Sequence, residues 1–130
     1  MPRRVETFLI HGKPVPKGSR VSGVTKSGTR FNRESNPHVG PWMKMAEKSL
    51  RSQCPVQLEP PYKIEASFYF TPPKEKSWPR TGDVDKFCRA LLDALTHSGV
   101  IEDDRHVIEL SAVKRYGDPR TEVTVEEVDH

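Results

Sequence analysis

Aspartates recur at short spacing in the second half of the chain, and an arginine lies among them. Asp83 and Asp85 are separated by one residue, and Arg89 follows Asp85 by four residues. Asp103 and Asp104 are adjacent. Clustered carboxylates repel one another at neutral pH unless a proton, a basic group or a divalent cation compensates them. Because two or three aspartates with water suit a hard cation, the pattern predicts a site for Mg²⁺ or Mn²⁺.

Such a cation would serve the hydrolysis of a phosphodiester. It polarises a phosphoryl oxygen, activates water and stabilises the leaving alkoxide. A guanidinium nearby stabilises the extra negative charge at phosphorus, and Arg89 lies one helical turn from Asp85 on the same face. A protein that only binds a polyanion gains nothing from acids that repel phosphates, so these residues favour a nuclease.

The same residues also allow a purely structural interpretation. Asp83 precedes a predicted helix and would then act as its N-cap, complementing the helix dipole. The pairs Asp85–Arg89 and Arg89–Asp93 would be solvated ion pairs, each worth about 0.2–0.5 kcal/mol. This alternative predicts a non-enzymatic basic module that binds DNA.

The hydrophobic pattern supplies the elements that must position these residues. Apolar side chains repeat at helical spacing over residues 84–98, and Gly99 follows as a C-cap. Period-two alternation over residues 62–70 predicts a strand. The order β-α-β-α-β-β predicts an α+β fold with a small mixed β-sheet and about two helices, in which the last two strands form a hairpin around residues 116–119. The other expected elements are a helix at 41–53 and strands at 7–10, 107–114 and 121–128.

Charge is unevenly distributed along the chain. The net charge is only +3, but residues 1–82 hold 15 Lys or Arg against 6 Asp or Glu, whereas residues 83–130 hold 6 against 12. The two parts therefore carry +9 and −6. Such asymmetry predicts a polyanionic partner, although an ordinary solvated surface also accounts for it.

Two segments rich in Gly, Pro, Lys and Arg interrupt the predicted elements. Residues 13–40 predict a long, basic and flexible loop with a possible small hairpin around Ser27 and Gly28, and residues 71–82 predict a second basic loop. Phe31 and Trp78 lie inside these loops. Each ring would either stack on nucleic-acid bases or pack onto the domain.

Length and composition narrow the class of protein. The 130 residues suit one domain, 1–130. No run of 18 apolar residues and no secretory segment is present in the sequence, so we expect a cytoplasmic protein without membrane association. Cys54 and Cys88 lack the spacing of a zinc site and are expected to be reduced thiols. No nucleotide cofactor is expected.

Residues 82–95 and 100–107 together resemble the RusA family of Holliday junction resolvases, the crossover junction endodeoxyribonucleases. The first segment reads GDVDKFCRALLDAL and the second VIEDDRHV. The family pattern has an Asp-x-Asp-Asn-Leu-x-Lys opening, an Asp-Ala-Leu helix end and an Asp-Asp-x-x-Val turn. The close resemblance covers roughly residues 80–115.

The resemblance implies a small homodimeric endonuclease that uses Mg²⁺, with Mn²⁺ as an alternative, to nick four-way DNA junctions in symmetric strands. It implies that Asp83, Asp85 and Asp104 are catalytic and bind the metal, with Asp103 in a secondary role. The essential basic position of the family, normally lysine, falls on Arg89, which keeps the charge but hardly deprotonates. Lys86 stands where the family has asparagine. Proteins of this kind often come from a phage.

Paired cutting agrees with two-fold symmetry, because one acidic site per chain supplies one cut and a C2 dimer supplies two. A metal-dependent nuclease that acts on flaps or single strands remains an alternative. Basic side chains of both loops, with two near the acidic segment, are the predicted DNA contacts. They are Lys13, Lys17, Arg20, Lys26, Arg30, Arg33, Lys74, Lys76, Arg80, Lys86 and Lys114.

Overall fold

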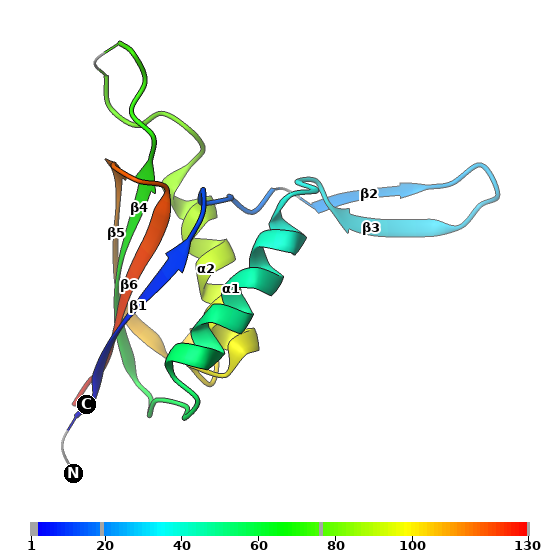
Figure 1. Ribbon diagram of the computed structural model, residues 1–130. Helices are drawn as coiled ribbons and strands as arrows, with labels where there is room; N and C mark the ends of the chain where they lie inside the picture. Colours follow the sequence, from blue (N-terminus) through cyan, green and yellow to red (C-terminus); the bar gives the residue numbers. More distant parts are fainter. Residues whose placement is uncertain (1–2, 19, 76, 130) are drawn as a thin grey trace.

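The computed structural model describes residues 3–18, 20–75 and 77–129, and leaves aside the side chains of residues 20, 21 and 31–34 (Figure 1). It contains six strands, two α-helices and one short 3₁₀-helix. In chain order these are β1 (Val5–His11), β2 (Arg20–Val24), β3 (Arg30–Glu34), α1 (Val39–Gln53), β4 (Tyr62–Phe70), α2 (Val84–Ser98), η1 (Asp104–His106), β5 (Val107–Tyr116) and β6 (Arg120–Glu127).

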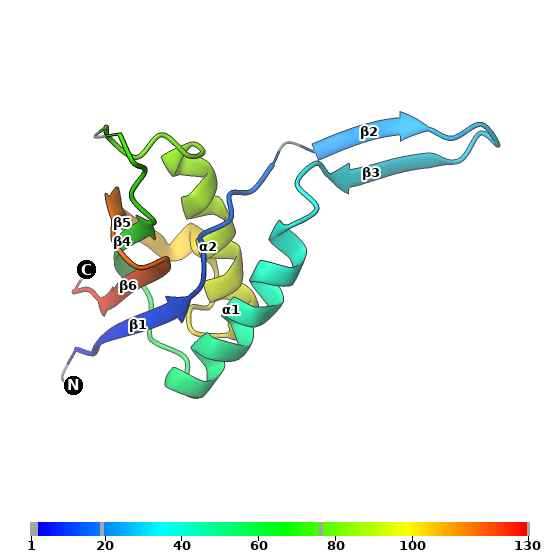
Figure 2. The ribbon, with the colours of Figure 1, turned by 45° about the horizontal axis from the view of Figure 1, so that its top comes forward.

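The core lies between one four-stranded sheet and the two helices. The sheet has the order β1-β6-β4-β5, and both helices cover the same face of it (Figures 1 and 2). Alternate residues of β4 from Tyr62 to Phe70 are buried against the helices, as the period-two pattern predicted. The mixed sheet with two helices confirms the predicted α+β class.

The two helices begin and end close to their predicted positions. α2 spans residues 84–98 as predicted, and Gly99 follows with a φ of +83°, the left-handed conformation of a helix C-cap. α1 begins two residues before its expected start and buries Trp42, Ala46 and Leu50. Cys54 and Cys88 are buried free thiols, as expected. Among the described residues, no helix is long and apolar enough to cross a membrane.

The predicted hairpin of the last two strands is wrong. β4 lies between β5 and β6, pairing with β5 in parallel and with β6 in antiparallel orientation. The helical crossover through α2 brings β5 alongside β4, so β6 pairs with the other edge of β4. The short connection crosses the end of β4, where the Gly117 amide donates to the Phe70 carbonyl at 3.0 Å. A Cβ atom at Gly117 would lie only 2.9 Å from the Tyr69 ring.

Regular structure occupies the middle of the basic segment 13–40. β2 and β3 form an antiparallel hairpin, which extends away from the helices (Figures 1 and 2). Its turn is closed by hydrogen bonds between Thr25 and Thr29, and Gly28 adopts a φ of +86° there. The possible small hairpin around Gly28 is thereby confirmed, and it involves more of the segment than the sequence suggested.

Candidate functional site

Asp83 and Asp85 lie at the N-terminal end of α2, where the parallel strands β4 and β5 end. Two contacts hold this junction. The Lys114 ammonium on β5 donates to the Gly82 carbonyl at 2.8 Å. Gly82 has a φ of +71°, and a Cβ atom there would come within 2.7 Å of the Phe87 ring. Because ligands of sheets with parallel strands bind outside the carboxyl ends of those strands, this edge is a favourable place for a site.

The structural interpretation of these acids is realised only in part among the described residues, because Asp85 lies in the first turn of α2, where a negative charge complements the helix dipole. Asp83 occupies the N-cap position, but its side chain makes no capping hydrogen bond. Asp85 and Arg89 are exposed and form no ion pair there with each other. Asp93 pairs instead with Lys17, from the segment before the hairpin. The carboxylates of Asp83 and Asp85 therefore face solvent and have no side-chain partner among the described residues, which leaves their oxygens available to a cation.

Asp103 and Asp104 form a second acidic pair at the start of β5. The Arg105 amide donates to the Asp103 carboxylate at 3.0 Å, and this bond lowers the pKa of Asp103. Burial raises the pKa of Asp104, and the hydrogen bond to Asp103 and the negative charges of Asp103 and Asp93 raise it further. Asp103 and Asp104 therefore lie near Asp93, a residue of α2.

A single chain does not bring the two acidic pairs together. α2 runs antiparallel to β5, so Asp83 lies near the end of β5 and Asp104 lies before its start. The helix rises about 15 Å between Asp83 and Asp93. Across the described parts of the chain, no three carboxylate, imidazole or thiol side chains are grouped so as to hold a metal ion. β5, the strand after α2, does pass beside Asp83, but it does so with its C-terminal end, which is far from Asp104.

An apolar groove lies between α2 and the edge strand β5. Its volume is about 430 Å³. Asp85 and Arg89 lie among its lining residues, so the groove borders the N-terminal acidic pair. On β5 itself, Ile108 is 52% exposed and Leu110 is 42% exposed. The sequence pattern did not predict this surface. Its signal was the presence of Ile108 and Leu110 in a strand that proves to lie at the sheet edge. The lining residues are Val84, Asp85, Cys88, Arg89, Leu92, Leu110 and Ala112.

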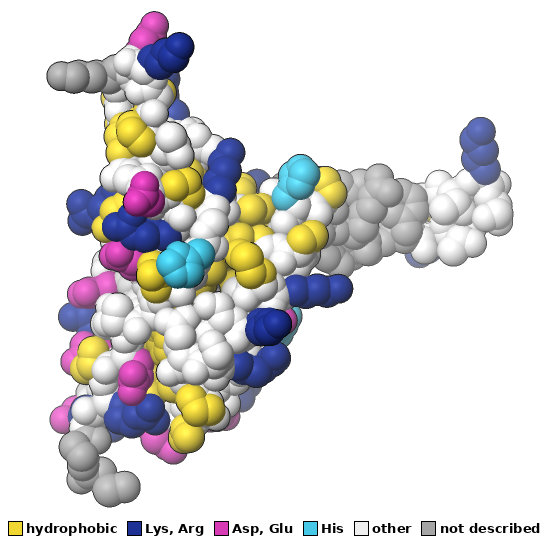
Figure 3. Space-filling model, in the orientation of Figure 1, with side chains coloured by type: hydrophobic (Ala, Val, Ile, Leu, Met, Phe, Trp, Pro, Cys, Tyr) yellow, Lys and Arg dark blue, Asp and Glu magenta, His cyan; other side chains and the backbone are white. Residues whose placement is uncertain are grey.

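The basic residues predicted to contact DNA have different surroundings. Lys26 and Arg30 are exposed near the turn of the hairpin, and Lys74 and Arg80 are exposed on the loop of residues 71–82. Figure 3 shows Lys and Arg side chains at the outer end of the hairpin and on the upper loop. Lys13 is also exposed and lines a cavity of about 160 Å³.

Three other predicted basic contacts are half-buried against the body. The ammonium of Lys17 pairs with Asp93, and that of Lys114 holds the Gly82 carbonyl. Lys86 follows Asp85 on α2, and its carbonyl accepts a hydrogen bond from the Lys17 amide at 3.0 Å. Lys76 and the side chains of Arg20 and Arg33 lie outside the described residues.

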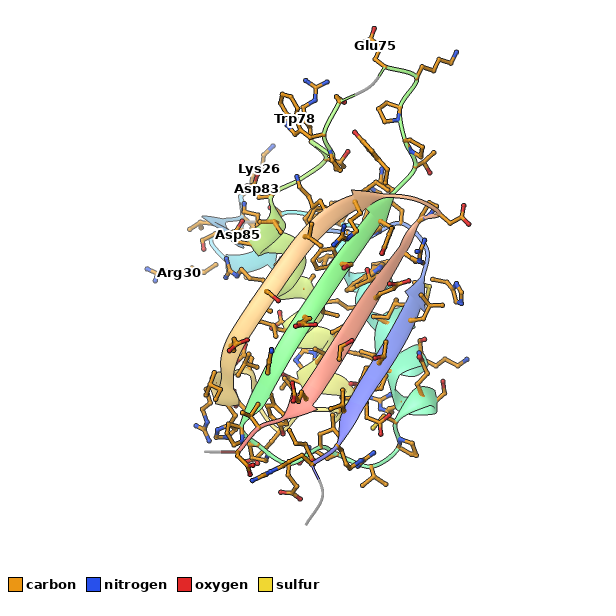
Figure 4. All side chains as sticks on the ribbon, turned by 90° about the vertical axis from the view of Figure 1, so that its left-hand side faces the viewer. Lys26, Arg30, Glu75, Trp78, Asp83 and Asp85 are labelled. Carbon is orange, nitrogen blue, oxygen red and sulfur yellow. The ribbon has the colours of Figure 1, made fainter. Side chains whose placement is uncertain are left out.

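Trp78 does not pack onto the domain. Its side chain is 72% exposed, on the loop that leads into Asp83. Figure 4 shows Trp78, Asp83 and Asp85 along one edge of the molecule; Lys26 and Arg30 overlap this edge in that view but belong to the hairpin. The side chain of Phe31, the other candidate for base stacking, lies outside the described residues.

Comparison with known proteins agrees with this arrangement of motifs. A family model described as endodeoxyribonuclease RusA matches residues 11–126. A search of curated proteins finds no match to the chain. The family match covers the hairpin, both helices, β4, β5 and most of β6, together with both acidic pairs. The chain therefore belongs to the RusA family of endodeoxyribonucleases.

Proposed function

We propose that this protein is a structure-selective endonuclease that resolves Holliday junctions by paired, metal-dependent cuts. Membership of an endodeoxyribonuclease family supports the reaction class. The observation that carries the proposal is the pair of exposed carboxylates, Asp83 and Asp85, beside Arg89 at the N-terminal end of α2. Neither acid makes a capping hydrogen bond or an ion pair among the described residues, so their interaction with the helix dipole leaves the carboxylate oxygens open to a cation.

The donor set of this pair fits a hard divalent cation, because it offers carboxylate oxygens and access to water. A bound Mg²⁺ or Mn²⁺ would polarise the phosphodiester and lower the pKa of water. Asp83 and Asp85 would hold the ion. Arg89 would neutralise charge that develops on the phosphoryl oxygens.

The third carboxylate of the site would come from a second copy of the chain. A two-fold axis across the middle of α2 and β5 would run these elements antiparallel to their copies. Asp104 of the partner subunit would then approach Asp83 and Asp85. Two observations support this arrangement, namely the apolar groove beside Asp85 and the exposed Ile108 and Leu110 on an unpaired sheet edge. The dimer would carry two such sites, one for each cut.

The basic surfaces would grip the arms of the junction. The hairpin carries Lys26 and Arg30 at its outer end, far from the acidic pair in sequence, and the loop before α2 carries Lys74 and Arg80. Phosphate contacts of this kind hold DNA in place and make its binding depend on salt.

A cleavage assay tests the proposal. We expect the protein to cut a synthetic four-way junction in Mg²⁺ and not in EDTA, and to leave a linear duplex of the same sequence intact. Faster cutting of a flap or of single strands than of the junction would contradict the junction assignment. Equal cutting in EDTA would contradict the metal dependence.

A further inference from the structure

The described residues of the loop 71–82 contact β5 at two points. Ser77 and the Tyr116 hydroxyl are 3.4 Å apart, and Lys114 holds the carbonyl of Gly82 at the end of the loop. Pro72, Pro73 and Pro79 restrict the backbone further, because proline fixes φ. These contacts and prolines limit the conformations open to the described part of the loop.

Within this loop, Trp78 presents its ring to solvent. It is 72% exposed, more than any other large apolar side chain described, whereas Trp42 is only 5% exposed. The Arg80 guanidinium lies 5.6 Å from the centre of the Trp78 ring, a cation–π contact that supports the ring from one side. An indole held in this way offers an aromatic surface that the protein's own folding does not use.

A cavity of about 200 Å³ opens beside the ring. Trp78 and Arg80 are among its lining residues, together with Tyr116 and the largely buried Phe70, and most of its accessible lining is polar. An exposed indole with a guanidinium beside it suits a nucleobase, which stacks on the ring while its phosphate meets the guanidinium. The lining is completed by Thr71, Pro73, Ser77, Pro79 and Thr81.

The position of this cavity relates it to the acidic pair. Trp78 and Asp83 are joined by a segment that spans at most about 17 Å when fully extended. At about 3.4 Å per nucleotide of a DNA strand, a base on Trp78 lies within about five nucleotides of a phosphodiester at Asp83. Figure 4 shows both residues on the same edge of the molecule.

We propose that Trp78, supported by Arg80, is a stacking platform for one base that unpairs at the branch point of the bound DNA substrate, and so helps to select branched DNA. This inference rests on the proposed function. Bases in a continuous duplex are stacked on each other, and extracting one breaks its base pair and its stacking. Bases at a branch point have lost part of their stacking, so a ring that stacks on them favours branched over linear DNA.

Abasic substitution tests this platform without metal or cleavage. Four-way junctions that lack one base at each position near the crossover are bound in EDTA by the wild-type protein and by Trp78→Ala. We expect one abasic position to weaken wild-type binding by about 5- to 150-fold, the loss that corresponds to one base–aromatic stack. The same substitution should leave binding by Trp78→Ala unchanged, and Trp78→Phe should restore most of the wild-type response.

Two controls accompany the measurement. Val56→Ala truncates another exposed apolar side chain, on the segment between α1 and β4, and should respond to abasic sites like the wild type. Arg80→Gln should weaken the response at the same position without abolishing it. Because Trp78 is exposed, the melting temperature of Trp78→Ala should remain within about 1–2 °C of the wild type.

Distinct results separate this inference from the proposed function. If abasic sites affect wild type and Trp78→Ala equally at every position, Trp78 does not stack on a base and the inference is wrong, while junction resolution stands. If neither protein prefers a junction to a linear duplex, the proposed function fails and the inference fails with it.

Discussion

Lys114 on β5 donates a hydrogen bond to the carbonyl of Gly82, the residue immediately before Asp83, at 2.8 Å. This bond ties the end of an edge strand to the N-terminal end of α2, across a long separation in sequence. It fixes the backbone from which Asp83 projects. The position of the acidic pair thus depends on β5 as well as on α2.

Lys114→Met is expected to slow junction cleavage in Mg²⁺ about tenfold, with little change in junction affinity. A hydrogen bond to a charged group contributes about 1.5–3 kcal/mol, and its loss would let the loop end and Asp83 shift. Single-turnover cleavage and binding in EDTA would separate the two effects. Arg115→Met, at the neighbouring exposed position, should cleave like the wild type. A parallel loss of affinity in Lys114→Met would instead indicate a direct phosphate contact.

Asp83→Asn is expected to abolish cleavage while junction binding stays equal or becomes tighter. The substitution removes a ligand of the proposed metal ion and also a negative charge that repels phosphate. Cleavage gels and fluorescence anisotropy would measure both quantities. Asp129→Asn, which removes an exposed acid paired with Arg3, provides the matched control. If binding falls in step with cleavage, Asp83 is a binding residue only.

Mixing two inactive variants would reveal whether the third carboxylate comes from the partner. Asp83→Asn and Asp104→Asn chains, refolded together, should form heterodimers with one intact site, because both substitutions would fall in the other site. We expect single nicks without complete resolution. A site assembled within each chain would leave the mixture inactive.

Leu110→Glu, which puts a charge into the apolar groove, should shift the protein to a monomer in light scattering.

The hairpin gives a prediction about salt. Lys26→Ala combined with Arg30→Ala removes two exposed cations near its turn. If both side chains contact phosphates, the slope of the logarithm of the association constant against the logarithm of the salt concentration should become shallower by about 1.8. Affinity for junction and duplex should fall by the same factor, because phosphate contacts carry no sequence or branch information. Lys63→Ala, on the open sheet face beside Glu109, should leave the slope unchanged.

Glu127 makes the fold depend on pH. Its side chain is 5% exposed and accepts hydrogen bonds from the amides of Arg4 at 2.9 Å and Glu59 at 2.6 Å. The Glu59 bond is the main reason that its pKa lies below the usual value of 4.5. A lowered pKa in the folded state means that ionised Glu127 stabilises the protein above about pH 4.5, and that this contribution disappears as the pH falls through the lower, folded-state pKa.

Glu127→Gln is therefore expected to lower the free energy of unfolding at pH 7 by about 1–3 kcal/mol. The difference from wild type should shrink as the pH falls below 4.5. Urea unfolding followed by circular dichroism between pH 3 and pH 7 would measure it, with the more exposed Glu65→Gln as the control. A difference that does not change with pH would show that the charge of Glu127 contributes nothing.

Elements with a clear local period could be predicted from the sequence alone. The apolar stripe of α2, the left-handed Gly99 behind it and the alternation along β4 depend on neighbours within one or two turns. Family membership was also accessible, because its motif lies within α2 and the turn that follows it. Local side-chain period and motif spacing are properties of the chain before it folds.

Tertiary structure alone decided which distant residues meet. The insertion of β4 between β5 and β6 follows from the crossover through α2, which no local pattern encodes. The same antiparallel packing of α2 on β5 separates Asp83 from Asp104 and brings Lys114 to Gly82. The ion pair between Lys17 and Asp93 also joins residues that are distant in sequence and that only tertiary packing brings together. Strand pairing and side-chain contact between remote segments depend on the global arrangement of layers, so the sequence indicated the acids of the candidate site but not their grouping.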